Sequence, residues 1–185
     1  APYKQPVSDK LRVHEIYLSL QGESTFAGLP CVFVRLTGCD LRCSYCDTAY
    51  AFTGGEAISI ESILDQVDAL AEGYPEPTLV ELTGGEPLLQ KATPALLAAL
   101  CDRGFTVLLE TSGAHDISTV DGRVHRIVDL KCPSSGECDR NFTENIAHLR
   151  PTDEVKCVIG TREDYVWAKD QLRQLFGKCE ILFSW

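Results

Sequence analysis

Short apolar runs alternate with amphipathic segments along most of the chain. Runs rich in β-branched residues predict buried strands at residues 31–37, 78–82, 105–110, 126–130, 154–159 and 179–183. Helical spacing of apolar positions predicts helices at residues 60–70, 93–104 and 163–176, with a shorter one at 141–149. Residues 12–19 alternate more loosely, which is typical of an edge strand or an N-terminal extension.

Strands that alternate with helical crossovers indicate an α/β fold with a parallel, right-handed sheet. About six such units are too few for a closed eight-stranded barrel. The pattern therefore predicts an incomplete, TIM-like βα barrel of about six parallel strands, with an open doubly wound sheet as the alternative. A chain of 185 residues is expected to form one domain, with residues 1–30 as an extension and 31–185 as the partial barrel.

Composition and charge argue against several classes of protein. The net charge is −10, which argues against a broad nucleic-acid surface. The sequence shows neither a signal peptide nor an apolar run long enough to span a bilayer, so no membrane partner is expected. The nine cysteines are odd in number and several lie in apolar runs, which favours a reducing, cytoplasmic location over a disulfide framework.

Three of these cysteines form a compact motif. Cys39, Cys43 and Cys46 are spaced C-x3-C-x2-C, with Tyr45 inside the motif and Thr48 just after it. A structural zinc site requires a fourth ligand, whereas a [4Fe–4S] cluster bound by three thiolates keeps one iron open for another ligand. The spacing alone leaves a zinc site or three incidental thiols as alternatives. Cys132 and Cys138 are interpreted as incidental loop thiols, and the four histidines show no ligand spacing.

Polar or glycine-rich residues follow four predicted strands. They are the cysteine loop and residues 83–87, 110–113 and 129–131. In parallel α/β folds the carboxyl ends of the strands form the ligand-binding rim. This arrangement indicates an enzyme or ligand-binding protein rather than a scaffold.

The cysteine motif and the sequence Gly84-Gly85-Glu86-Pro87 together resemble the radical S-adenosylmethionine (SAM) enzymes. In that family the open iron binds the amino and carboxylate groups of SAM, and the Gly-Gly-Glu-Pro motif holds the amino group. The resemblance implies a [4Fe–4S] cluster on the three cysteines. It also implies SAM-binding roles for Tyr45, Gly84, Gly85, Glu86, Thr111, Ser112 and Lys131, although Lys131 could instead pair with Asp129 structurally.

Four further elements resemble the 7-carboxy-7-deazaguanine synthases of queuosine biosynthesis: S-L-Q-G-E, F-V-R-L-T-G-C, C-D-T after the last cysteine, and L-T-G-G-E-P. The resemblance is close over residues 13–131. It implies substrate contacts from Leu20, Gln21, Gly22, Glu23, Arg35 and Thr83, and a Mg²⁺ ligand at Thr48. Arg35 also interrupts an apolar strand, so it is expected to face the cavity or a carboxylate partner.

The resemblance implies conversion of 6-carboxy-5,6,7,8-tetrahydropterin to 7-carboxy-7-deazaguanine with loss of ammonia. It further implies a reductant such as flavodoxin or ferredoxin, and a homodimer. Relatives continue with a Gln-x-His-Lys element that this sequence lacks, so C-terminal substrate contacts are not assigned. The alternatives are another small radical SAM enzyme, such as a glycyl-radical activase, or a non-catalytic iron–sulfur or zinc-binding module.

Overall fold

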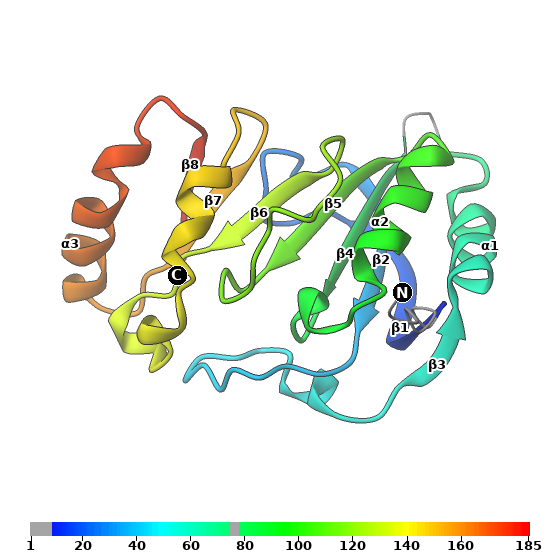
Figure 1. Ribbon diagram of the computed structural model, residues 1–185, viewed down its shortest axis with the longest axis horizontal. Coiled ribbons are helices and arrows are strands. Elements are labelled where there is room, and N and C mark those ends of the chain that lie inside the picture. Colours follow the sequence, from blue (N-terminus) through cyan, green and yellow to red (C-terminus); the bar gives the residue numbers. More distant parts are fainter. Residues whose placement is uncertain (1–8, 75–77) are drawn as a thin grey trace, which may run out of the picture.

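The chain is built around one sheet that the computed structural model places at its centre (Figure 1). The structure describes residues 9–74 and 78–185, and in them the strand order is β3-β1-β2-β4-β5-β6-β7-β8. The strands are β1 Lys10–Leu20, β2 Pro30–Leu36, β3 Glu56–Ser59, β4 Leu79–Gly84, β5 Thr106–Thr111, β6 His125–Asp129, β7 Glu154–Val158 and β8 Glu180–Ser184. Six neighbouring strands of the sheet are parallel to one another: β2, β4, β5, β6, β7 and β8. This confirms the six predicted parallel strands.

The α-helices cover one face of the sheet. Apolar side chains of β2, β4 and β5 pack against α1 (Ile60–Ala71) and α2 (Thr93–Asp102), and those of β7 pack against α3 (Arg162–Gln171). The terminal strands β3 and β8 are not paired with each other, so the sheet is an open partial barrel. This confirms the partial barrel rather than the doubly wound alternative, which would have helices on both faces.

Local signals in the sequence account for the helix ends. The Ser59 hydroxyl accepts a hydrogen bond from the Ser62 N–H over 3.2 Å and caps α1. Gly104, with φ of 90°, follows α2 in the left-handed conformation that glycine adopts without strain. Thr161 and Asp164 form a reciprocal capping box at the start of α3.

Several predicted elements differ from the structure. β3 was not predicted, because Glu56–Ser59 is too short to show alternation, and its pairing with β1 moves β1 away from the edge of the sheet. The predicted helix at 163–176 ends at Gln171 and continues as a 3-10 turn, Leu172–Leu175. In such a turn residues three apart lie on the same side, so Leu172 and Leu175 are both buried.

The predicted helix at residues 141–149 is instead a 3-10 segment, Thr143–His148. The Asn145 side chain ties it to the loop after β5, accepting from the Ile117 N–H and donating to the Gly113 and His115 carbonyls. None of the helices in the described ranges is long and apolar enough to cross a membrane.

Alternation along the strands gives the sheet its second, polar face. On β4 the side chains of Val80 and Leu82 join the helix-covered core, so Glu81 and Thr83 face the opposite way. Register pairs Asp129 on β6 with Lys156 on β7, and places them on this same polar face. Glu81, Asp129 and Lys156 therefore lie on the concave side of the partial barrel. Arg126 on β6 lies instead on the helix-covered face, where it pairs with Asp153.

Candidate active site

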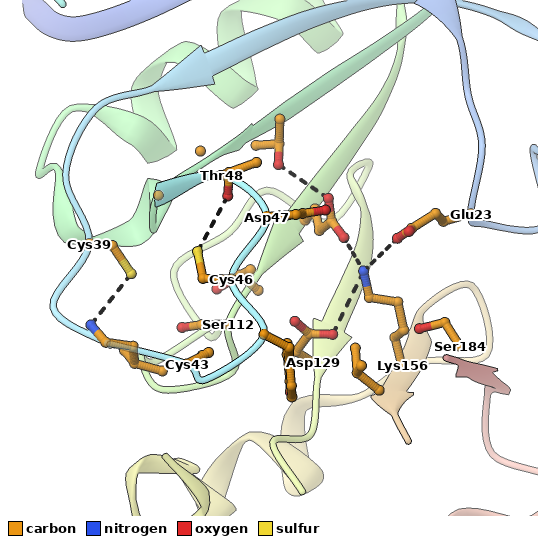
Figure 2. Close-up of a pocket in the computed structure, with 18 of the residues that line it drawn as sticks. Glu23, Cys39, Cys43, Cys46, Asp47, Thr48, Ser112, Asp129, Lys156 and Ser184 are labelled. Carbon is orange, nitrogen blue, oxygen red and sulfur yellow. Dashed lines mark hydrogen bonds and ion pairs between the residues drawn. The ribbon is translucent and has the colours of Figure 1, made fainter. Parts of the chain in front are cut away.

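A cavity of about 500 Å³ opens at the carboxyl ends of the parallel strands. It is lined by residues of the cysteine loop, the loop after β1 and the ends of β2, β4, β5, β6 and β7. Five carboxylates and three cationic side chains contribute to the part of this lining that the structure describes. Figure 2 shows the cysteines on one side of this cavity and Lys156 on the other.

The cysteine loop brings its three thiols to one wall of the cavity. Cys39, Cys43 and Cys46 all line it. Backbone hydrogen bonds hold the loop just before Cys39 and again between Cys43 and Cys46. The Gly38 N–H donates to the Ala51 carbonyl over 2.9 Å, and the Ser44 N–H donates to the Ser135 carbonyl over 2.9 Å. The loop is therefore fixed by backbone contacts that leave the sulfurs available to a ligand.

The thiols would have to lose their protons to bind a metal cluster, because the thiolate is the metal ligand. Burial raises the pKa of Cys39 and of Cys43, so the free thiols stay protonated at neutral pH. No three His, Cys, Asp or Glu side chains in residues 9–74 and 78–185 are arranged around a single metal ion. In a cuboidal cluster each thiolate binds a different iron, so its cysteines need not converge on one point.

The Gly-Gly-Glu-Pro loop lies directly beneath the cysteine loop. The Glu86 N–H donates to the Gly38 carbonyl over 2.7 Å, and a β-carbon on Gly85 would stand 1.9 Å from that oxygen. Gly84 and Gly85 line the cavity, whereas Glu86 is fully buried outside the lining. A β-carbon on Gly84 would likewise stand 2.9 Å from the Leu36 carbonyl oxygen, so neighbouring backbone leaves no room for a side chain at either position.

The Glu86 carboxylate is hydrogen-bonded to other residues of the protein. The carboxylate accepts hydrogen bonds from the Thr111 hydroxyl over 2.9 Å, the Ser112 N–H over 2.7 Å and the Leu88 N–H over 2.8 Å. These contacts join the end of β4 to the end of β5. Thr111 and Ser112 thereby take up fixed positions on the cavity wall.

Lys131 and Tyr45 lie on the same wall. The Lys131 ammonium donates to Asp129 over 2.5 Å and stands 5.8 Å from the centre of the Tyr45 ring. The Tyr45 hydroxyl and Asp129 Oδ1 are buried without a hydrogen-bond partner. Buried polar atoms normally have partners, so these two oxygen atoms fit a site that holds a polar ligand.

Most of the predicted substrate residues also line the cavity. They are Gln21, Gly22, Glu23, Arg35 and Thr83, and Thr48 joins them from the cysteine loop. Leu20 lies outside the lining, with 63% of its surface exposed.

The Arg35 guanidinium is held in place by three partners. It donates to Glu15 Oε1 over 2.8 Å, the Tyr17 hydroxyl over 3.1 Å and the Gly84 carbonyl over 3.2 Å. Only 12% of the side chain is exposed. Arg35 thus meets both expectations for it, since it faces the cavity and pairs with a carboxylate.

Two charged residues of the cavity, Glu81 and Lys156, were missed by sequence reasoning. Glu110 and Asp129 also line it and lie in rim segments that the sequence predicted, although no ligand-binding role was assigned to them. The Lys156 ammonium contacts Glu110, lies 2.8 Å from Glu23 and 3.8 Å from Asp129, and its side chain is 7% exposed (Figure 2). The signal that identified Arg35, a charge inside an apolar strand, would also have found Glu81 and Lys156.

Comparison with known proteins agrees with this geometry. Residues 33–134 match the Radical SAM superfamily. The chain is 48% identical over 181 residues to the 7-carboxy-7-deazaguanine synthase of Chlorobaculum tepidum, covering 94% of this chain and 79% of the relative. It is 47% identical over 165 residues to the synthase of Koribacter versatilis, covering 89% and 71%.

The chain belongs to the 7-carboxy-7-deazaguanine synthase family. The crystal structure of QueE from Escherichia coli is similar, with a TM-score of 0.77 and 25% identity over 94% of this chain and 83% of that one. Membership in the radical SAM superfamily implies a [4Fe–4S] cluster and SAM as cofactors. A cuboidal cluster on three thiolates is consistent with Cys39, Cys43 and Cys46 on the cavity wall.

Proposed function

We propose that this enzyme converts 6-carboxy-5,6,7,8-tetrahydropterin to 7-carboxy-7-deazaguanine, with loss of ammonia. The observation that carries the proposal is one shared cavity, lined by the three thiols, the glycine loop and the Gln21–Glu23 segment together. Its volume suits a cofactor and a small substrate rather than an inserted protein loop. This favours the deazaguanine synthase over a glycyl-radical activase.

Cys39, Cys43 and Cys46 would hold the cluster, and SAM would lie against Gly84, Gly85, Thr111 and Ser112. When bound, the reduced cluster and SAM supply the carbon radical that removes a hydrogen atom from the pterin. The protein binds and orients both ligands and excludes water. Glu86 contributes by fixing Thr111 and Ser112, since its own carboxylate is already occupied.

Lys131 and Tyr45 complete the SAM side of the cavity. The ammonium of Lys131 would meet the SAM carboxylate while remaining paired with Asp129. Although burial opposes it, the charge of Asp129 raises the pKa of Lys131, so this residue stays cationic. The unpartnered Tyr45 hydroxyl would gain a partner from the bound ligand.

On the substrate side, Arg35 would pair with the pterin carboxylate, with Thr83, Gly22 and Glu23 alongside. The Thr48 hydroxyl would help to hold a Mg²⁺ ion, which prefers oxygen ligands and would supply positive charge near that carboxylate. Leu20 would contribute only by leading β1 into Gln21, since it lies outside the cavity lining.

The family resemblance also supports three proposals about context. A one-electron donor such as flavodoxin or ferredoxin would reduce the cluster, and the functional enzyme would be a homodimer. The enzyme would work in the cytoplasm, where thiols are kept reduced.

The decisive experiment is an anaerobic assay of reconstituted enzyme with SAM, dithionite and Mg²⁺, with and without the pterin. We expect pterin-dependent formation of 7-carboxy-7-deazaguanine, measured by mass spectrometry. Cys43→Ala should abolish product and cluster binding, whereas Cys101→Ala, a substitution on α2 away from the cavity, should keep both. SAM cleavage without pterin turnover would reject this substrate. The absence of SAM cleavage by cluster-loaded enzyme would favour the binding-module alternative.

A further inference from the structure

A closed ring of side-chain contacts joins the loop after β1 to three strands of the sheet. The Gln21 side-chain N–H donates to Glu81 Oε2 over 2.9 Å, and the carboxyl groups of Glu81 and Glu110 contact each other. The Lys156 ammonium contacts both Glu110 and Glu23. The backbone N–H of Glu23 donates to Gln21 Oε1 over 2.8 Å. The ring thus passes through β4, β5 and β7 and closes on the loop.

Gln21 connects this ring of contacts to the backbone of the loop after β1. Its side-chain oxygen accepts from the backbone N–H groups of both Glu23 and Ser24. Its backbone carbonyl accepts from the Gly28 N–H over 2.7 Å, and its backbone N–H donates to the Leu29 carbonyl over 2.9 Å. Gln21 therefore shapes the whole turn that follows β1, and Glu81 fixes the orientation of its amide.

Two carboxyl groups in contact require a shared proton. Glu110 is flanked by Lys156 and by the Thr83 hydroxyl, which donates to it over 3.2 Å. Glu81 is 2% exposed and is flanked by the neutral amide of Gln21. The charge is therefore stabilised on Glu110, and the proton is carried by Glu81.

The electrostatic surroundings agree with this assignment. Burial, together with the neighbouring Glu110, raises the pKa of Glu81 to about 8. Although burial opposes it, Lys156 lowers the pKa of Glu110. From β2, Glu81 also faces the thiol of Cys31, whose pKa is raised by burial and by Glu81 itself.

We propose that Glu81 is a positioning residue for the pterin: as a neutral carboxylic acid it donates to Glu110 and accepts from Gln21, and so fixes residues 21–23 at the cavity. The inference rests on the proposed role of these residues in substrate binding. Ionisation of Glu81 would place two negative charges in contact and remove the donor between them. Above about pH 8 the loop would loosen and the pterin would bind more weakly.

The test compares cluster-loaded wild-type enzyme with Glu81→Gln and Glu81→Leu between pH 6.5 and 9.5. Glutamine keeps a donor and an acceptor but cannot ionise, whereas leucine removes both contacts. The control is Asp65→Asn, which changes an exposed carboxylate on α1. KM for the pterin, kcat and the Kd of SAM are measured at each pH.

We expect the ratio of wild-type KM to Glu81→Gln KM to rise about tenfold across this range, while the Kd of SAM and the control follow wild type. Titration of the pterin itself affects both enzymes equally and cancels in the ratio. Glu81→Leu should raise KM at every pH with little change in kcat. A ratio that does not vary with pH would overturn the proposal.

Hydrogen–deuterium exchange of the peptide spanning residues 21–28 gives a readout that needs no substrate. After correction for intrinsic rates, exchange should become faster above pH 8 in wild type and not in Glu81→Gln. If this difference appears but the pterin is not turned over, the proposed function fails and the role of Glu81 in holding the loop stands. If neither enzyme shows a pH-dependent change in the loop, the role of Glu81 is rejected.

Discussion

The carbonyl oxygen of Gly38 occupies the space in which any residue other than glycine at position 85 would place its β-carbon. The separation would be 1.9 Å, and the obstacle is backbone rather than a movable side chain. Gly38 precedes the first cysteine, and its carbonyl also accepts the Glu86 N–H. Contact with the glycine loop therefore sets the position of the cysteine loop.

Gly85→Ala should displace the cysteine loop and impair cluster assembly. We expect a several-fold loss of iron and sulfide per chain after reconstitution, measured by chemical analysis and visible absorbance. Gly122→Ala is the matched control, because its new β-carbon would meet only an Arg150 nitrogen at an ordinary 3.6 Å. Full cluster loading in Gly85→Ala would contradict this account.

Glu86→Gln should destabilise the junction of β4 and β5. The carboxylate accepts from Leu88, Thr111 and Ser112, and an amide would turn a donor toward at least one of these donors. We expect a loss of about 1–3 kcal/mol in the free energy of unfolding, measured in urea, together with weaker SAM binding. Glu163→Gln on the exposed surface of α3 should change neither quantity. Unchanged stability in Glu86→Gln would show that this network contributes little.

The fold could be predicted largely from the sequence, because buried strands and helix ends each require particular residue types at neighbouring positions. Parallel strands appear as apolar runs, and Ser59 and Gly104 mark helix ends through their own backbone chemistry. The addition of β3 to the sheet could not be predicted, since its pairing with β1 depends on contacts far apart in sequence. Local pattern carries no information about such pairing.

Part of the candidate site could likewise be predicted from the sequence and part could not. The cysteine motif and the glycine loop are each continuous in sequence, so their ligand-binding chemistry could be predicted without a structure. Lys156 and Glu23 are 133 residues apart in the sequence, and Glu81 and Gln21 are 60 residues apart. The sequence shows only that each charge interrupts an apolar strand, and not which partner compensates it.

Lys156→Met should strongly destabilise the protein. The lysine compensates Glu110 and Asp129, whose side chains are 26% and 12% exposed, and its removal would leave these largely buried carboxylates without a counter-charge. Although burial opposes it, Asp129 and Glu110 raise the pKa of Lys156, so the lysine is charged throughout the working pH range. We expect a loss of about 3–5 kcal/mol in urea unfolding, against no change for Lys178→Met on the exposed surface. A small loss would mean that the carboxylates take up protons at little cost.

Stability should depend on pH through Glu81. Its pKa is about 8 in the folded protein against an ordinary 4.5, so the folded state binds the proton more tightly. The stabilisation is fully present below about pH 4.5 and is lost as pH rises toward 8. The free energy of unfolding of wild type, minus that of Glu81→Gln, should therefore fall by on the order of 1 kcal/mol per pH unit across this window. A difference that stays constant from pH 5.5 to 8.5 would show that Glu81 is ionised in the folded protein.

Arg35→Lys tests the proposed contact with the pterin carboxylate. Lysine keeps the charge but loses the planar guanidinium that contacts Glu15, Tyr17 and Gly84 at once. Losing one charged hydrogen bond to the substrate, worth about 1.5–3 kcal/mol, should raise KM for the pterin by roughly 10- to 100-fold. SAM affinity should change much less than pterin affinity, because Arg35 contacts the proposed SAM site only through the Gly84 carbonyl. Arg123→Lys, which alters an exposed pair with Asp102 and Asp121, is the control. Equal losses of SAM and pterin affinity in Arg35→Lys would indicate that Arg35 supports the whole rim of the cavity rather than one ligand.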